Sequence, residues 1–184
     1  TWAAIAEASK KGQFNYAMTN PSTSNTGMSA LFAVALALAN KTEDLQLSDI
    51  KTQGLQNFLQ GQKLTAGSSG WLADTYLKES ARLDGMINYE SVLLQLNQKL
   101  PAAQQLQVIF PQDGVISADY PLMLLNTQKR AQYQTLINAW KSAAFQKQAS
   151  QRAFIRPSNP DAPVNPALSS SPVAELSFPS QLAV

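Results

Sequence analysis

The spacing of apolar and polar residues predicts alternating helices and strands in the first half of the chain. Apolar residues three or four apart, such as Trp2 and Ile5, favour amphipathic helices. The polar cluster before Met28 leads into a helix that is apolar almost all round, which indicates burial on more than one side. We expect helices over residues 2–11, 28–39 and 71–83, and one or two helices over 44–60 that are interrupted near Gly54. We also expect strands over 14–19 and 86–89, and a loop over 61–67.

The sequence of the second half predicts fewer helices and strands, and its amino-acid composition changes near the end. Pro121 interrupts an apolar run early, which favours a strand at an edge or crossing position. Six of the ten prolines lie between Pro157 and Pro179, which is typical of an extended tail or linker. We expect helices over residues 90–100 and 127–152, and strands over 106–110 and 120–125.

Strands that alternate with helices place the chain in the α/β class. We expect a three-layer α/β/α lobe over residues 1–156, built on a mixed sheet with helices on both faces. A crossing strand near 120–125 and a long C-terminal helix complete this lobe. Residues 157–184 are then a proline-rich tail.

Composition and charge narrow the function classes. Hydrophobic residues make up 45% of the 184 residues and charged residues 14%, which indicates a folded, lightly charged domain. Fourteen Lys and Arg against twelve Asp and Glu give a formal net charge of +2, and these charges are scattered along the sequence. We therefore expect no nucleic-acid partner.

The residue types that are missing exclude most enzyme classes. Without His or Cys, the chain cannot by itself supply a Ser-His-Asp triad, a cysteine nucleophile, a zinc site or an iron–sulfur cluster. Thr1 could be an N-terminal nucleophile, but we interpret it as a residue at a boundary. We expect no enzyme activity and no cofactor.

The beginning of the sequence and its apolar stretches bear on targeting. Thr1 follows no initiator Met or apolar leader, so we interpret the chain as a piece of a longer protein, with any signal peptide upstream. The longest uncharged apolar stretch, 28–39, is shorter than the ~20 residues that span a bilayer. We expect no membrane span, and the lack of Cys fits a reducing or an oxidising compartment.

The most informative segment is the polar turn between the strand over 14–19 and the next helix. Such a turn forms the usual anion site of an α/β sheet, because free backbone N–H groups and the helix dipole point at the ligand. Two further helix starts could line the same cleft at the carboxyl edge of the sheet. The candidate ligand-binding residues are Ser22, Thr23, Ser24, Asn25, Thr26, Gly27, Ser68, Ser69 and Tyr89.

Structural roles compete with this interpretation. Ser, Thr, Asn and Gly at a helix start are common caps, and Tyr89 also suits a strand-end aromatic. The acidic pairs Glu43 with Asp44 and Asp113 with Asp119 lack the spacing of a calcium loop. We interpret these carboxylates as solvated.

Several short motifs occur in a fixed order. They are Trp2-x-x-Ile5, Ala17-Met18-Thr19-Asn20-Pro21-x-x-Ser24-Asn25-x-Gly27, Asn88-Tyr89-Glu90-Ser91, Phe110-Pro111-x-Asp113-Gly114, Asp119-Tyr120-Pro121-Leu122 and, after a long helix, Phe154-Ile155-Arg156-Pro157. This order resembles the bacterial extracellular solute-binding proteins of the type 2 periplasmic fold, and among them the molybdate, sulfate and phosphate binders. The chain has Ala153 before Phe154, where many members of that family have Gly.

The resemblance implies the second lobe of a two-lobed clamshell, with the first lobe upstream and Tyr89 near the hinge. Neutral donors at helix N-termini would hold a small oxyanion between the lobes, for uptake or sensing. The implied partners are that anion and an ABC transporter permease or an adjacent domain of the same chain. The implied location is periplasmic or extracellular, with any membrane anchor outside this chain.

The tail over 172–184 is similar to stretches that lead into a von Willebrand factor A domain, which would make the parent a bacterial envelope protein. This leaves an alternative, a protein-interaction module that kept the fold and lost the ligand. Such a module would use another surface, for example around Trp71 and Tyr76 if both are exposed. The sequence does not identify the ligand.

Overall fold

Three short parallel strands form the sheet in the computed structural model, which describes residues 1–168 and 174–178. β1 (Tyr16–Thr19) is central, with β2 (Gln62–Ala66) on one side and β3 (Gly85–Met86) on the other. Both neighbours pair with β1 in parallel, and Thr19 lies opposite Ala66. Parallel neighbours need a crossover connection, and a helix follows each of these strands. The predicted α/β class is therefore confirmed.

The residues group into two compact units. Of the described residues, unit 1 holds Thr1–Leu93, Leu106–Ser117 and 174–178, and unit 2 holds Leu94–Gln105 and 118–168. These boundaries follow contacts in space and differ from the expected division after residue 156, which stays a prediction.

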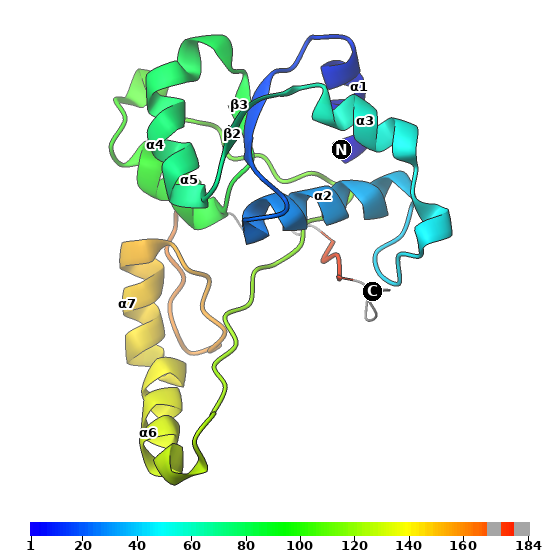
Figure 1. Ribbon diagram of the computed structural model, residues 1–184. Coiled ribbons are helices and arrows are strands. Elements are labelled where there is room, and N and C mark those ends of the chain that lie inside the picture. Colours follow the sequence, from blue (N-terminus) through cyan, green and yellow to red (C-terminus); the bar gives the residue numbers. More distant parts are fainter. Residues whose placement is uncertain (169–173, 179–184) are drawn as a thin grey trace. The chain divides into compact units, whose positions relative to one another are not determined.

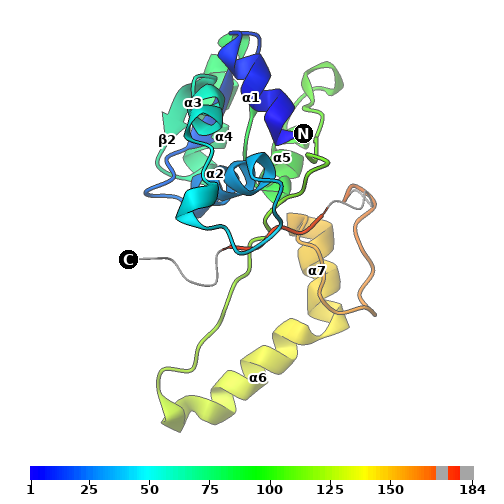
Figure 2. The same ribbon diagram turned by 90° about the vertical axis from the view of Figure 1, so that its right-hand side faces the viewer.

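Unit 1 contains the sheet and most of the helices. α4 and α5 lie to one side of the strands in Figure 1, and α1 and α3 lie to the other. α1, α2 and α3 pack on one another (Figure 2). The helices are α1 (Trp2–Lys10), α2 (Asn25–Leu38), α3 (Thr52–Leu59), α4 (Ser69–Glu79) and the start of α5 (Glu90–Asn97), with 3₁₀ turns at Leu47–Asp49 and Ser80–Arg82.

The core of unit 1 is aromatic where α1, β1 and α3 meet. Tyr16 and Phe58 are fully buried with ring centroids 5.1 Å apart, and Trp2 meets Phe58 edge to face at 6.2 Å. The Tyr16 hydroxyl donates a 2.8 Å hydrogen bond to the Phe58 carbonyl oxygen, which satisfies the polar end of a buried ring. Burial raises the pKa of Tyr16 well above its usual value. All four residues of β1 are buried, so the strand is covered on both faces.

Asp113 and Gly114, which are far from α1 in the sequence, accept hydrogen bonds from its first residue. The backbone N–H of Trp2 donates to both carboxylate oxygens of Asp113, at 2.8 and 3.0 Å. The Trp2 indole N–H donates to the Gly114 carbonyl oxygen at 2.8 Å. A carboxylate at a helix N-terminus is favourable because of the helix dipole. Asp113 therefore has a structural role and is not the solvated carboxylate that we expected.

Unit 2 is mainly helical. It contains the end of α5, 3₁₀ turns at Ala102–Gln104 and Thr127–Lys129, α6 (Arg130–Lys141) and α7 (Ala143–Ala153). Among its described residues, few hydrophobic ones are buried, namely Leu96, Phe154, Ala162 and Leu168. Residues after α7 return along it, and Ser150 and Asn165 join the two segments through a 2.9 Å hydrogen bond.

The single helix expected over 127–152 is wrong, because the chain breaks at Ser142. This residue has extended backbone angles, φ −66° and ψ 143°, and its hydroxyl accepts a hydrogen bond from the Phe145 N–H at 3.2 Å. The hydroxyl also donates to the Ala139 carbonyl oxygen at 2.6 Å. Ser142 thus caps the next helix instead of continuing the last one, and Figure 2 shows α6 and α7 as separate rods.

Three further expectations about strands are wrong. Residues 61–67, expected as a loop, contain β2, because this short polar segment pairs along the whole of β1. Residues 106–110 and 120–125 form no strand among the described residues, so the crossing strand is absent there and the described sheet is parallel, not mixed. Strand propensity favours an extended backbone but does not supply a partner strand.

No helix within the described residues has the length and apolar character needed to span a membrane.

Candidate functional site

Three loops meet at the carboxyl edge of the sheet, the edge where β1, β2 and β3 end. Each loop leads into a helix: residues 20–24 into α2, 67–68 into α4, and 87–89 into α5. Because the strands are parallel, these three helix N-termini lie at one edge.

Hydrogen bonds join these loops to one another. The Asn25 side-chain amide donates to the Tyr89 hydroxyl at 3.1 Å, and the Asn88 side-chain amide donates to the Ser69 carbonyl oxygen at 3.0 Å. The backbone N–H of Asn20 donates to the Ala66 carbonyl oxygen at 3.0 Å. Of the candidate residues, the structure therefore joins Asn25 to Tyr89, and Ser69 to the loop that carries Tyr89.

Asn20 organises the turn before α2. Its side-chain oxygen accepts from the Ser22 N–H at 2.9 Å, and its carbonyl oxygen accepts from the N–H groups of Thr23 and Ser24 at 3.1 and 3.0 Å. These three N–H groups are therefore already hydrogen-bonded within the turn. Sequence reasoning missed this role, although Asn before Pro is a recognised turn signal.

The start of α2 offers the remaining donors. The first N–H groups of a helix have no partner within it, so the N–H groups of Asn25, Thr26 and Gly27 are the donors left at this end. Ser24 is the N-cap residue, yet its side chain makes no cap hydrogen bond. Its half-buried hydroxyl thus lies at the helix start without the task that a cap serine usually has.

Thr26 and Gly27 are buried at the start of α2. Thr26 is buried, and its hydroxyl has no hydrogen-bond partner among the described residues. A Cβ on Gly27 would lie 2.3 Å from the Thr19 carbonyl oxygen, so only glycine lets α2 approach β1 this closely. Ser22, Thr23 and Asn25 are exposed, and their side chains are accessible at the edge.

Ser68 and Ser69 differ from Ser24. The Ser68 hydroxyl accepts from the Trp71 N–H at 3.4 Å and so caps α4. Ser69 is half-buried, and its carbonyl oxygen is the acceptor for Asn88. Trp71, in the first turn of α4, is 70% exposed. The second loop is therefore hydrogen-bonded to the third, and the helix that follows it exposes the indole ring of Trp71.

The carboxyl edge carries little charge. Residues 19–30, 66–73 and 86–93 contain one charged residue, Glu90, in the first turn of α5. A ligand at this edge would meet hydrogen-bond donors and helix dipoles, and no Lys or Arg of these segments.

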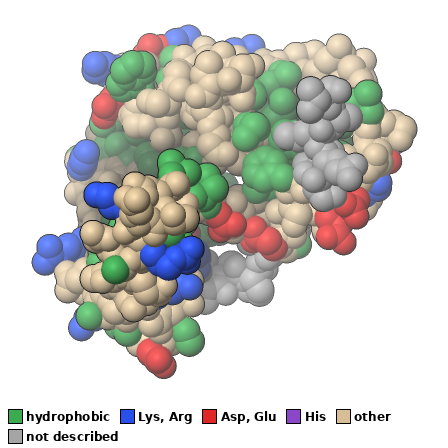
Figure 3. Space-filling model, turned by 60° about the horizontal axis from the view of Figure 1, so that its bottom comes forward, with side chains coloured by type: hydrophobic (Ala, Val, Ile, Leu, Met, Phe, Trp, Pro, Cys, Tyr) green, Lys and Arg blue, Asp and Glu red, His purple; other side chains and the backbone are tan. Residues whose placement is uncertain are grey.

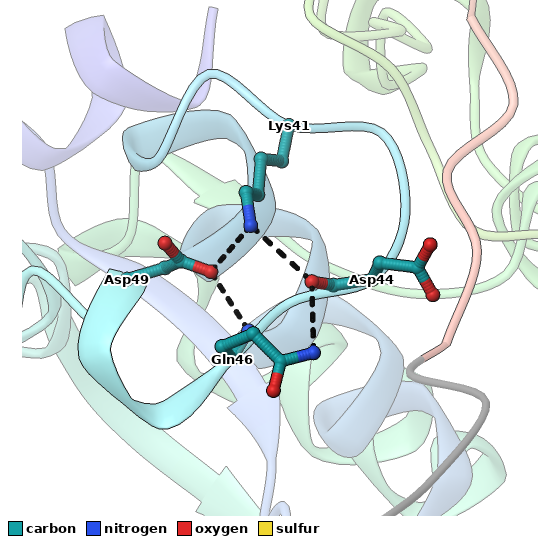
Figure 4. Close-up of polar contacts among 4 residues, drawn as sticks. All are labelled: Lys41, Asp44, Gln46 and Asp49. Atoms are coloured by element: carbon teal, nitrogen blue, oxygen red, sulfur yellow. Dashed lines mark hydrogen bonds and ion pairs between the residues drawn. The ribbon is translucent and has the colours of Figure 1, made fainter.

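The Asp49 carboxylate, outside this edge, has structural partners. In the loop after α2, Lys41 donates to the Asp49 carboxylate at 2.6 Å and to the Asp44 carbonyl oxygen at 3.3 Å (Figure 4). The Gln46 N–H also donates to the Asp49 carboxylate, at 2.8 Å. The hydrogen bond from Lys41 lowers the pKa of Asp49. No three acidic, His or Cys residues of the described ranges are grouped so that they could hold a metal ion.

Comparison of the chain with protein-family models, with curated proteins and with solved structures gives no match.

Proposed function

We propose that the chain is an extracytoplasmic solute-binding module that holds a small oxyanion at the carboxyl edge of its sheet. The N–H groups of Asn25, Thr26 and Gly27 would bind the anion, with hydroxyl donors from Ser24 and neighbouring residues. One observation carries this proposal: the N-cap hydroxyl of Ser24 makes no cap bond at a helix start that is joined to the start of α5, which is joined in turn to the start of α4.

The chemistry of the edge fits a dehydrated anion. Neutral donors stabilise an anion without the strong pull of a full positive charge, and backbone groups fixed by a turn need no reorganisation. Asn20 fixes the turn, and Gly27 fixes α2 against β1. The site would therefore be rigid on this side.

The resemblance to type 2 periplasmic solute-binding proteins supplies the biological setting of the proposal. In that setting the chain is one lobe of a clamshell in the periplasm or outside the cell, and serves uptake or sensing. An ABC transporter permease or an adjacent domain would be its protein partner, and a following von Willebrand factor A domain would place it in an envelope protein. Closure of the clamshell over the anion would exclude water from the hydrogen bonds.

A second candidate function rests on Trp71. This ring is 70% exposed, as an interaction module would require, whereas Tyr76 is buried and cannot contribute. A single open indole at the carboxyl edge gives this candidate less support than the joined helix starts give to anion binding.

An NMR titration of backbone amides tests the proposal. We expect molybdate, sulfate or phosphate, but not all three equally, to shift the amide signals of Asn25, Thr26 and Gly27 in a saturable way. The N–H groups of Ser22 and Thr23, which Asn20 accepts, should move less. If the protein is folded and neither the three oxyanions nor a small carboxylate shifts any amide signal, the interaction module is favoured.

A further inference from the structure

Unit 2 has several exposed large apolar side chains. α6 contains no buried residue, although its residues at helical spacing are apolar. A 12-residue helix alone in water is marginal, so a helix like this gains stability when its apolar face is covered. We define the docking face as the exposed large hydrophobic residues of this region: Tyr120, Met123, Leu125, Leu136, Trp140 and Phe145.

The docking face contains one aromatic pair. Trp140, at the end of α6, stacks on Phe145, at the start of α7, with ring centroids 6.5 Å apart and an interplanar angle of 25°. They are 39% and 47% exposed, and Leu125 is 90% exposed. The Tyr133 hydroxyl donates to the Leu122 carbonyl oxygen at 3.0 Å, which joins α6 to the segment before it.

Positive charge is concentrated in the same unit. Residues 120–160 contain no Asp or Glu and six basic residues, which are Lys129, Arg130, Lys141, Lys147, Arg152 and Arg156. Unit 2 as a whole has seven basic and two acidic residues, whereas unit 1 has seven basic and ten acidic residues. The net charge of +2 is therefore the sum of +5 in unit 2 and −3 in unit 1. Figure 3, in which the bottom of Figure 1 comes forward, shows several Lys and Arg side chains and scattered hydrophobic ones at the lower left.

We propose that the docking face of unit 2 binds the surface of a membrane that contains anionic lipids. On α6, Arg130 and Lys141 project beside the arc that holds Leu136 and Trp140, by helical spacing. Such a helix lies in the plane of the interface, with apolar residues in the acyl boundary and cations at the headgroups. Trp and Tyr suit this depth, because their rings are apolar and their tips are polar.

Other occupants fit less well. A second copy would bring two units of +5 face to face, which costs electrostatic energy. A nucleic acid would use the cations and could stack on the rings, but it gives the aliphatic side chains of Met123, Leu125 and Leu136 no role. An anionic lipid surface satisfies the cations and the aliphatic side chains together. The proposal goes beyond anion binding at the carboxyl edge and does not depend on it.

Vesicle flotation of the whole chain tests the proposal. We expect the chain to float with phosphatidylcholine vesicles that contain phosphatidylglycerol, to bind far less to phosphatidylcholine alone, and to be released by salt. The combined substitution Lys129→Gln, Arg130→Gln and Lys141→Gln should weaken binding by roughly tenfold or more. The matched control, Lys10→Gln, Lys11→Gln and Lys63→Gln in unit 1, changes the net charge equally and should not.

The apolar part is tested by Trp140→Ala with Phe145→Ala, against Trp71→Ala as the exposed tryptophan of unit 1. We expect the first variant to lose vesicle binding, the second to keep it, and both to retain the circular dichroism spectrum of the unchanged chain. The proposal is overturned if anionic vesicles do not bind, or if the unit 1 variants weaken binding as much. It is also overturned if the unchanged chain does not bind vesicles but forms dimers or binds DNA, and Trp140→Ala with Phe145→Ala abolishes that association.

Discussion

Ser24 and Ser68 occupy the same position before their helices and do different things. Ser68 accepts the N–H of Trp71 as a cap, whereas the Ser24 side chain makes no cap bond. The turn before α2 is instead held by Asn20, which accepts three N–H groups. Asn20 therefore holds this turn, and the Ser24 side chain makes no cap bond there.

Ser24→Ala and Ser68→Ala therefore separate binding from stability. We expect Ser24→Ala to leave the free energy of unfolding nearly unchanged and to weaken oxyanion binding by about 1–2 kcal/mol. Ser68→Ala should destabilise the protein by about 1 kcal/mol through the lost cap. Denaturant unfolding and anion titration of both variants measure the two effects. A loss of stability in Ser24→Ala, with binding intact, would make Ser24 a structural residue.

At the scale of elements, close approach of α2 to β1 positions the candidate site. Gly27 lies against the end of β1, and the fully buried Met18 and Thr19 complete this contact region. The N-terminal N–H groups of α2 reach the carboxyl edge only because no side chain separates the helix from the strand at this point.

Gly27→Ala should consequently destabilise unit 1. The added Cβ would lie 2.3 Å from the Thr19 carbonyl oxygen, and a backbone oxygen cannot move without displacing β1. We expect a loss of about 1–3 kcal/mol or more, larger than the gain in helix propensity.

Gly70→Ala is the matched control, because its Cβ would meet nothing within 4 Å in the first turn of α4. It should be neutral or stabilising by up to about 1 kcal/mol. Chemical denaturation compares the two variants, and equal effects would argue against close packing at Gly27.

At the scale of the whole molecule, the two units differ in how their helices are buried. α2 buries seven residues in unit 1, and α6 buries none in unit 2. They also differ in net charge, which composition of the whole chain does not reveal. The units are therefore expected to differ in local stability and in their partners.

Hydrogen exchange should show this difference directly. We expect amides of α6 to exchange much faster than those of β1 and α2, because few buried contacts oppose local opening of α6. Exchange measured by mass spectrometry, with and without anionic vesicles, would report both states. Protection of α6 equal to that of β1 in the free protein would contradict this expectation.

Local patterns sufficed to locate most helices, since the spacing of apolar residues and the caps around them are local properties. The strand at β1 and the polar turn before α2 were found in the same way. The break at Ser142 was missed because a serine in a helical pattern can continue a helix or cap the next one. β2 was missed because its polar residues form a strand only by pairing with β1.

The sequence by itself determined the α/β class, the position of the polar turn and the exclusion of His- and Cys-based chemistry. Tertiary structure decided which strands pair, which of the candidate N–H groups are consumed by Asn20, and that Thr26 and Gly27 are buried. It also left large apolar side chains exposed in unit 2, beside the basic residues that the sequence already concentrates in 120–160. The physical reason is that pairing, burial and electrostatic fields depend on distances in space between residues far apart in the chain.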